Sequence, residues 1–166
     1  MKTRKVELGI INVGNSIMVS DPCYGVCSIN NKLIDNISDG RFNAFVRLGM
    51  VNGWSERVKE LTICKVGRKA FTALKHLDEL GCVSVDSGVC GIYDSSYFNE
   101  FHDESRANDD WYKDNVLNGF HDSLEEAYIT KSKGIHSCSG YGDGVYPIYI
   151  KKDENDKIFQ ITIRFI

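Results

Sequence analysis

The sequence predicts a mainly β protein of the α+β class. We expect antiparallel strands that form a single antiparallel sheet, a sandwich or a barrel-like structure, with two or three short helices and a C-terminal β-meander. Two observations predict this class. Runs of alternating or β-branched residues recur along the chain, as in half-buried strands. An Asn-Gly pair at 52–53 also separates two of these runs, which is a strong local signal for a β-hairpin.

In the first part of the chain, residues 5–12 and 16–20 are expected to form strands joined by a tight turn. Residues 21–40 are expected to form a long connection with a short helical turn around Leu33. The hairpin should pair residues 41–51 with residues 54–66, and both of its central residues should adopt positive φ.

The middle of the chain mixes helical and strand patterns. Residues 68–80 are expected to form a helix, because leucines and Phe71 recur at three-residue steps and Gly81 follows as a C-cap. A strand with poor alternation is the alternative. Two short strand-like segments follow at 82–88 and 89–94, and residues 96–101 could continue the second one.

The last part of the chain is expected to begin with a helix at 108–119, with Asn108 as its N-cap. Residues 123–126 have capping-box spacing and should open a short helix or turn. The meander should then consist of three antiparallel strands at 134–138, 145–150 and 158–166, joined by polar loops.

Composition bounds the class of protein. The 166 residues are 42% hydrophobic and 26% charged, which predicts a single globular domain over residues 1–166. No apolar run approaches the ~18 residues of a membrane helix, and no signal-peptide cleavage site is present, so we expect a cytoplasmic protein without membrane contact.

A net charge of −3 argues against direct DNA or RNA binding. The most basic stretch, residues 57–69, is expected to be a solvated strand face, with a local anion-binding patch as the alternative.

The cysteines and histidines give no catalytic or metal motif. Six cysteines occur without a CxxC pair, and the four histidines form no HExxH grouping, so we expect reduced thiols, no metal and no cofactor. The acidic residues lack the regular spacing of a calcium-binding loop.

Three segments stand out as candidate binding loops. The glycine-rich segment at 139–144 (SGYGDG) is either a hairpin turn or a nest of backbone N–H groups facing an anion, with Tyr141 as a stacking platform and Asp143 beside it. The segment at 21–25 (DPCYG) is either a rigid turn capped by Asp21 or part of a pocket with Tyr24.

The third segment, residues 85–94 (VDSGVCGIYD), is either a β-bulge with local capping or a source of three more pocket residues, which are Asp86, Ser87 and Asp94. A hydrolase is a further alternative. It would use Cys23 or Asp21 with a histidine, His136 or His121, brought close by the fold.

The order of DPCY, VDSGxxGIYD and SGYGDGxYPxYI resembles a family of short uncharacterised proteins of bacteria and phages. The resemblance spans nearly the whole chain and assigns no reaction. It implies that Asp21, Asp86, Ser87, Asp94, Tyr141 and Asp143 belong to a shared structure or site. Cys90 departs from the small residue expected at its position, which weakens any catalytic role for it. For a phage protein the location would be the host cytoplasm.

These observations predict a non-catalytic protein that binds a small anionic or nucleotide-like ligand. A phage-type anti-defence protein that sequesters a nucleotide-derived signal is the most specific form of this hypothesis. A protein-interaction module or inhibitor of a host protein is the first alternative, with edge-strand pairing as its recognition mode, and the hydrolase is the second. Homo-oligomers are compatible with the sequence. The hypothesis requires the three candidate loops to meet at one end of the β structure.

Overall fold

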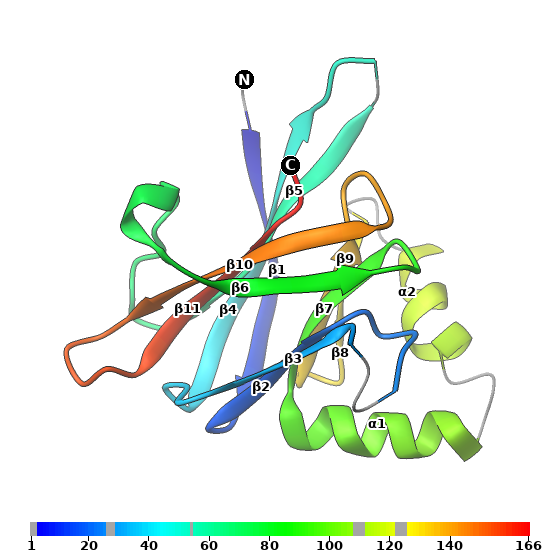
Figure 1. Ribbon diagram of the computed structural model, residues 1–166, viewed down its shortest axis with the longest axis horizontal. Helices are drawn as coiled ribbons and strands as arrows, with labels where there is room; N and C mark the ends of the chain where they lie inside the picture. The colour runs from blue at the N-terminus through cyan, green and yellow to red at the C-terminus, as the bar shows by residue number, and fades with distance from the viewer. Residues whose placement is uncertain (1–2, 26–28, 54, 108–111, 122–125) are drawn as a thin grey trace.

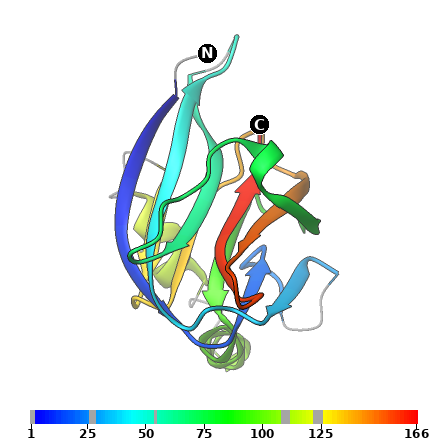
Figure 2. The same ribbon diagram turned by 90° about the vertical axis from the view of Figure 1, so that its left-hand side faces the viewer.

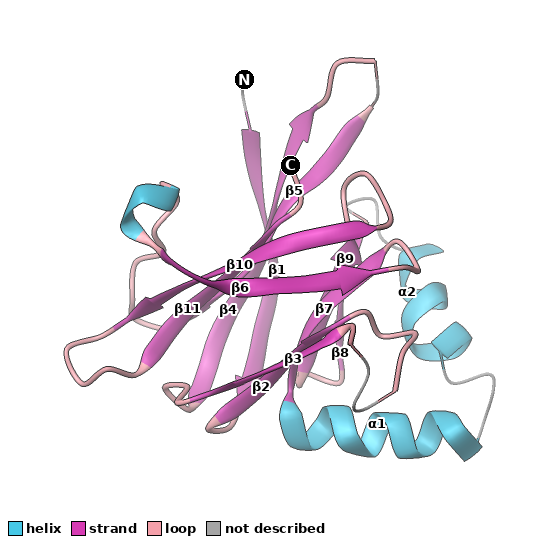
Figure 3. Ribbon diagram, viewed as in Figure 1, coloured by secondary structure: helices cyan, strands magenta, loops and turns pink. Residues whose placement is uncertain are grey.

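The computed structural model describes residues 3–25, 29–53, 55–107, 112–121 and 126–166 (Figure 1). Strands dominate these residues, as Figure 3 shows by colour. In chain order the elements are β1 (Thr3–Val13), β2 (Ser16–Ser20), β3 (Asn31–Asp35), β4 (Gly40–Met50), β5 (Glu56–Lys65), the 3-10 helix η1 (Leu74–His76), β6 (Asp78–Val85), β7 (Val89–Asp94), α1 (Ser95–Ala107), the π-helical turn η2 (Lys113–Leu117), α2 (Asn118–His121), β8 (Ala127–Thr130), β9 (Gly134–Cys138), β10 (Gly144–Lys152) and β11 (Ile158–Arg164).

The strands form two antiparallel sheets. Six strands lie in the order β1-β4-β5-β11-β10-β6, and five lie in the order β3-β2-β7-β9-β8. Figures 1 and 2 show the sheets as two layers. Aliphatic residues of both sheets, among them Ile63, Ile92 and Ile161, are fully buried in one core between them. The predicted mainly β, antiparallel class is therefore confirmed, and the strands form two sheets, as in the sandwich alternative.

A second apolar cluster lies on the outer face of the five-stranded sheet, beneath the helices. Tyr93 of β7 and Phe98 of α1 are its largest members, with ring centroids 5.4 Å apart, and Val116 of η2 closes it. Figure 1 shows α1 and α2 on this side of the molecule. None of the described helices is long and apolar enough to span a membrane.

Several sequence-based expectations about strands are confirmed. The expected strands at 5–12 and 16–20 correspond to β1 and β2, and β4 and β5 form the expected hairpin. Its turn differs from the prediction, because positive φ occurs at Gly53 and not at Asn52. The connection between the strands is longer than two residues, so a turn with two positive φ values is not needed.

The expected C-terminal meander is wrong at its first strand. β10 and β11 pair as predicted, but β9 pairs with β7 and β8 in the other sheet. Segment 139–144 therefore begins as a crossover between sheets, not as a hairpin loop. Alternation in the sequence shows that a strand has one buried face. It does not show which sheet the strand joins, because both sheets have a buried face.

The helix expected at 68–80 is also wrong. Most of this segment is irregular and covers the outer face of the six-stranded sheet, with η1 at its centre and β6 at its end. The side chain of Gln160 in β11 accepts from the Phe71 amide at 2.7 Å and donates to the Phe71 carbonyl at 2.8 Å. This tertiary contact replaces the hydrogen bonds that a helix would make, and Gly81 lies within β6 with φ +138°.

Two other segments also differ from the prediction. Residues 96–101, expected as a possible strand, belong to helix α1, whose first turn is capped by Asp94. Leu33, expected in a helical turn, lies in strand β3, which pairs with β2. The helix expected at 108–119 is confirmed from residue 113 onward. Its proposed cap Asn108 lies outside the described residues, as do positions 123–125 of the expected turn.

Candidate functional site

Strand register brings two of the three candidate loops side by side. Val85 pairs with Gly144 in the six-stranded sheet, and Val89 pairs with Cys138 in the five-stranded sheet. Residues 86–88 and 139–143 therefore cross the same gap between the sheets. They are joined where the Ser139 amide donates to the Gly88 carbonyl at 3.0 Å.

The third loop, residues 21–25, joins them because β2 lies beside β7. Ser20, at the end of β2, pairs with Gly91. The loop that follows starts next to residues 86–88. We call loops 21–25, 86–88 and 139–143 the motif loops. The structure brings them together at one end of the molecule, as the binding hypothesis requires.

Asp21 holds two of the motif loops together and is fully buried. One oxygen, Oδ2, accepts from the backbone amides of Asp86 at 2.8 Å and Ser87 at 2.7 Å. The other, Oδ1, accepts from the Ser87 hydroxyl at 2.7 Å and the Cys23 amide at 3.0 Å. Four donors thus satisfy the Asp21 carboxylate, so Asp21 forms a structural clamp with Ser87 and has no acceptor position left for a ligand.

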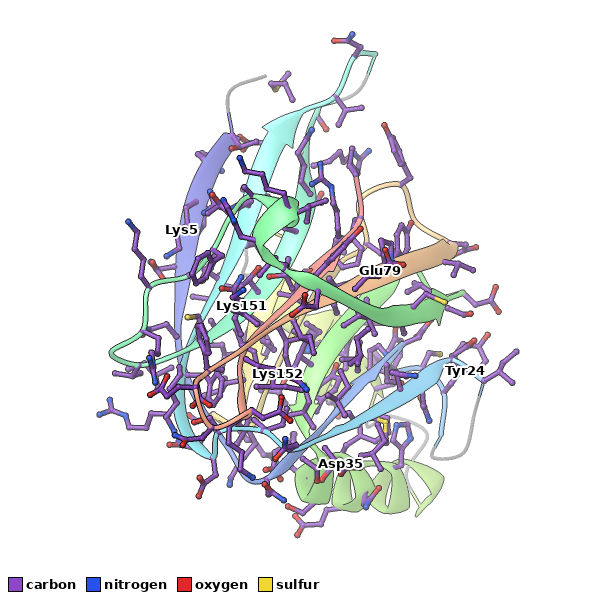
Figure 4. The ribbon with its side chains drawn as sticks, turned by 60° about the vertical axis from the view of Figure 1, so that its left-hand side comes forward. Lys5, Tyr24, Asp35, Glu79, Lys151 and Lys152 are labelled. Carbon is purple, nitrogen blue, oxygen red and sulfur yellow. The ribbon has the colours of Figure 1, made fainter. Side chains whose placement is uncertain are left out.

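An open groove of about 570 Å³ lies beside this clamp. Tyr24, Asp86 and Asp143, one from each motif loop, contribute its tyrosine and its two carboxylates. Figure 4 shows Tyr24 at the margin of the molecule. Ile29, Asn30, Ser84, Val85, Gly144 and Val145 complete the lining. The groove is thus built by segments that are far apart in the sequence.

The groove is acidic and contains one strong internal contact. The Tyr24 hydroxyl donates a hydrogen bond to Oδ2 of Asp86. This bond is the main reason why the pKa of Tyr24 is raised to about 12, with burial and the charges of Asp86 and Asp21 adding to it. Asp143 is exposed, and no cationic side chain occurs among the described residues that line the groove. The groove therefore favours groups that donate hydrogen bonds.

The glycine-rich loop is closed by hydrogen bonds within it and by one from Tyr146. Ser139 donates through its hydroxyl to the Gly142 carbonyl at 2.6 Å, and the Gly142 amide donates to the Ser139 carbonyl at 3.3 Å. The Tyr146 hydroxyl donates to the same Gly142 carbonyl at 2.7 Å. Gly140 has φ +67°, and a Cβ there would lie 2.9 Å from the Val58 carbonyl oxygen, so only glycine fits. Tyr141 is 55% exposed but does not line the groove.

Asp94 is the predicted site residue that the structure places elsewhere. It lies at the far end of β7, roughly 16 Å along the strand from Val89 at about 3.3 Å per residue. It accepts from the Gly14 amide at 2.7 Å, the Tyr97 amide at 3.1 Å and the Ser96 hydroxyl. It is the N-cap of α1 and fixes the turn between β1 and β2, so its role is structural.

We expect Asp94→Ala to lower the free energy of unfolding by about 2 kcal/mol at pH 7, because a cap and two further acceptor contacts are lost. Burial alone would raise the pKa of Asp94, but hydrogen bonds from Ser96, Gly14 and Tyr97 lower it below its usual value. A carboxyl whose pKa is lower in the folded state stabilises that state at pH values above its unfolded-state pKa of about 3.9. This stabilisation is lost as the pH falls through the folded-state pKa. Urea denaturation should therefore show the difference from the wild type shrinking below about pH 4.

Asp39→Ala serves as the control for this experiment, since Asp39 is exposed and its side chain makes no hydrogen bond in the described structure. A constant difference between wild type and Asp94→Ala from pH 7 to pH 3 would contradict the assigned role of the carboxylate.

Residues 14–163 match the model of a family described as "Protein of unknown function (DUF4241)". The chain belongs to this family. The match includes all three motif loops, and the expected resemblance to an uncharacterised family is confirmed at that level. No curated protein and no solved structure matches the chain.

Two of the groups needed for a hydrolase lack the required properties in this DUF4241 chain. Burial raises the pKa of the Cys23 thiol, and the negative charges of Asp21 and Asp86 raise it further. A nucleophilic thiol needs the opposite shift. Asp21, the other proposed nucleophile, is saturated by four donors.

The proposed base His136 is fully buried on β9, against the rings of Tyr93, Phe120 and Tyr128. Burial lowers its pKa to about 3, so this imidazole is a poor proton acceptor. The side chain of His121 lies outside the described residues. Among the described residues, no group of three or more His, Cys, Asp and Glu side chains could hold a metal ion.

Sequence reasoning missed the apolar part of the groove in this DUF4241 chain. Ile29 is 92% exposed and Val145 is 64% exposed, and both line the groove. In the sequence, Val145 is only the start of an expected strand, and Ile29 lies in an expected connection. Neither residue carries a local signal, because an exposed aliphatic side chain is recognised only once its surroundings are known.

Proposed function

We propose that this protein is a non-catalytic ligand-binding protein and that the motif-loop groove is its binding site. The observation that carries the proposal is the meeting of Tyr24, Asp86 and Asp143 at one open groove, although their loops lie far apart in the sequence. The proposed nucleophiles support binding rather than turnover. Asp21 is saturated, and the pKa of Cys23 is raised.

The chemistry of the groove indicates which part of a ligand it would contact. Asp86 and Asp143 are acceptors, and the Tyr24 ring with Ile29 and Val145 offers apolar contact. A nucleoside matches this combination, because its amino and hydroxyl groups donate hydrogen bonds and its base has an apolar face. For a nucleotide-derived ligand, we propose that the nucleoside part occupies the groove while the phosphates face solvent.

In this proposal the protein acts by holding its ligand without converting it. A phage-type anti-defence protein that sequesters a nucleotide-derived signal in the host cytoplasm would need only contacts that bind the ligand tightly, and no catalytic group. The acidic side chains among the described groove residues favour recognition through base and ribose over recognition through phosphate at this site.

The test is native mass spectrometry, followed by calorimetry, against a panel of nucleosides, mononucleotides and cyclic dinucleotides. We expect one ligand per chain and no turnover. Asp143→Asn should weaken binding about tenfold, because a charge-assisted hydrogen bond is lost while the shape of the side chain is kept. Asp39→Asn is the matched control, with the same change at an exposed carboxylate outside the groove, and it should leave the affinity unchanged.

Two outcomes would reject this proposal. One is conversion of the bound nucleotide by the wild-type protein, which would restore the hydrolase alternative. The other is equal affinity of wild type and both Asp143→Asn and Tyr24→Phe for every ligand that binds, which would place the site elsewhere.

A protein partner is the second candidate for the same groove. The exposed side chains of Ile29 and Val145 lie beside the end of β6, which is an edge strand of the six-stranded sheet. Edge strands and exposed apolar side chains both promote protein association. If a nucleoside displaces a protein partner, the two ligands bind the same surface. If the nucleoside binds while the partner stays fully bound, their binding sites are different.

A further inference from the structure

A second hollow, of about 370 Å³, carries an excess of positive charge. It lies on the face of the six-stranded sheet that is turned away from the main core. Its lining has three cationic side chains and one carboxylate side chain, together with two threonines and Ile166. We call it the cationic hollow, and its residues are Thr3, Arg47, Lys59, Glu60, Thr72, Arg164 and Ile166.

Strand register places three of these charged residues in one row. Arg47 on β4 lies directly opposite Glu60 on β5, and Glu60 lies directly opposite Arg164 on β11. Residues paired in this way point to the same face of a sheet, with Cβ atoms about 5 Å apart. The two guanidinium groups therefore flank one carboxylate on adjacent strands.

A β-bulge adds the third cation. The pairing of β4 with β5 passes from Arg47 opposite Glu60 to Leu48 opposite Val58, which leaves Lys59 without a partner residue on β4. Neighbouring strand residues normally point to opposite faces, but the bulge lets Lys59 and Glu60 line the same hollow. The Lys59 stem lies over Gly49, where a Cβ would be 2.8 Å from Lys59 Cε.

Glu60 holds the two arginines without saturating them. It is 9% exposed. Its carboxylate oxygens lie 3.4 Å from Arg47 Nε and 3.7 Å from Arg164 Nη1. Both distances exceed the roughly 2.8 Å of a charge-assisted hydrogen bond. Burial raises the pKa of Glu60, and the charges of Arg164, Arg47 and Lys59 oppose this shift.

The remaining donors of the arginines are available at the hollow. Arg164 Nε donates to the Ile166 carbonyl oxygen at 3.0 Å, which fixes the plane of its guanidinium. Arg47 turns its Nε edge to Glu60, so its two Nη groups are left for another acceptor. Within the described ranges of the chain, Glu60 is the one carboxylate within 4 Å of Arg47.

The geometry points to a binding site for a phosphate group, free or carried on a small molecule, formed by Arg47, Lys59 and Arg164. Three positive side chains face one negative side chain, and this excess of cationic side chains suits an anion. Guanidinium groups bind phosphate oxygens in pairs, and the Lys59 ammonium adds a point charge. The threonine hydroxyls are further donors.

This site is separate from the motif-loop groove. Lys5 pairs with Arg47 and so extends the charged row onto β1. Figure 4 shows Lys5 and Tyr24 on opposite sides of the molecule. The cationic hollow and the motif-loop groove share no lining residue, although Ile166 of the hollow lies close to Gly140 of the motif loops, and the two sites are tested with different probes and variants.

Isothermal titration calorimetry of the full chain at low ionic strength, with inorganic pyrophosphate and inorganic phosphate as probes, tests this inference. We expect one pyrophosphate per chain. Arg47→Gln should weaken binding about tenfold, because it removes a charge and a paired donor. Lys5→Gln is the matched control. Lys5 lies in the same row, but its ammonium contacts Glu7 and the Phe45 ring, so its loss should change the affinity less than about twofold.

Three further measurements complete the test. Lys59→Gln provides a second variant if Arg47→Gln does not fold, and it should also weaken binding. Glycerol 3-phosphate, which has no nucleoside part for the groove, distinguishes the two sources of phosphate, because tighter binding of it than of inorganic phosphate identifies a phosphorylated small molecule, and the reverse identifies the free ion. Nucleoside binding, measured on the same variants, should be unaffected.

No heat of binding with pyrophosphate, or equal losses in Lys5→Gln and Arg47→Gln, would overturn the inference. Equal losses of pyrophosphate affinity in the two variants would show that the ion responds to the overall surface charge and does not occupy a specific site. Because Asp143→Asn should leave pyrophosphate binding intact, failure of this inference and failure of the groove proposal give different results.

Discussion

Asp21→Asn is expected to lower the free energy of unfolding by about 3 kcal/mol, one of the two largest effects that we predict for a single substitution. The change keeps the size of the side chain and replaces one acceptor oxygen with an NH₂ donor. In the folded state, each oxygen of Asp21 accepts from two donors at 2.7–3.0 Å. The new amide would face two of these donors in a fully buried site.

Urea denaturation followed by circular dichroism measures this effect. Asp143→Asn provides the comparison, because it makes the same chemical change at an exposed carboxylate on a neighbouring motif loop, and it should change the unfolding free energy by less than about 0.5 kcal/mol. Equal stability of the two variants would mean that Asp21 does not clamp the loops.

The clamp also links stability to the proposed binding site. Asp21 fixes the backbone of Asp86 and Ser87, and the Asp86 side chain lines the groove. We infer that Asp21 is a positioning residue for the groove. Any effect of Asp21→Asn on affinity would act through the placement of Asp86 and not through direct contact with the ligand.

Gly134→Ala is expected to destabilise the protein by about 3 kcal/mol or more, because it overpacks a site that cannot relax. Gly134 on β9 lies directly opposite Tyr93 on β7, and a Cβ at this position would overlap the Tyr93 ring. The ring is fully buried against Phe98. A Cβ at Gly91 would overlap the same ring, so Tyr93 lies between two positions without side chains.

Gly53→Ala is the control that distinguishes the cost of steric overlap from the cost of backbone strain. Gly53 has φ +80°, and no atom lies within 4 Å of the place that a Cβ would occupy, so alanine there should cost about 1 kcal/mol through strain alone. Thermal and urea unfolding of both variants gives the comparison. A cost for Gly134→Ala no greater than that for Gly53→Ala would show that the Tyr93 ring moves freely, contrary to its packing.

The sequence predicted some residues of the candidate site correctly and included one that does not belong to it. The Asp-Pro pair at 21–22 indicated a turn capped by Asp21, and the structure shows this cap at the Cys23 amide. The sequence also placed Tyr24, Asp86 and Asp143 in candidate loops, and all three line one groove. It included Asp94 for the same reason, because a polar residue at a strand end has the same local pattern whether it caps a helix or faces a groove.

The cationic hollow shows why some groups escape sequence analysis. Arg47, Lys59 and Arg164 lie on three strands, and only Lys59 belongs to the basic stretch at 57–69. Their meeting depends on the register of β4, β5 and β11 and on the bulge at Lys59. Neither the register nor the bulge is encoded by a local pattern.

The sequence alone determined the β class, the positions of most strands and the turn at Asp21, because these depend on contacts between residues that are close in the chain. The tertiary structure decided which sheet each strand joins, since β9 and β10 have equally suitable apolar faces and differ only in their partners. It also overrode the helical pattern at 68–80, where Gln160 binds the backbone of Phe71 from another strand. Long-range hydrogen bonds and burial decided these elements, because they outweigh local preferences of a few tenths of a kcal/mol per residue.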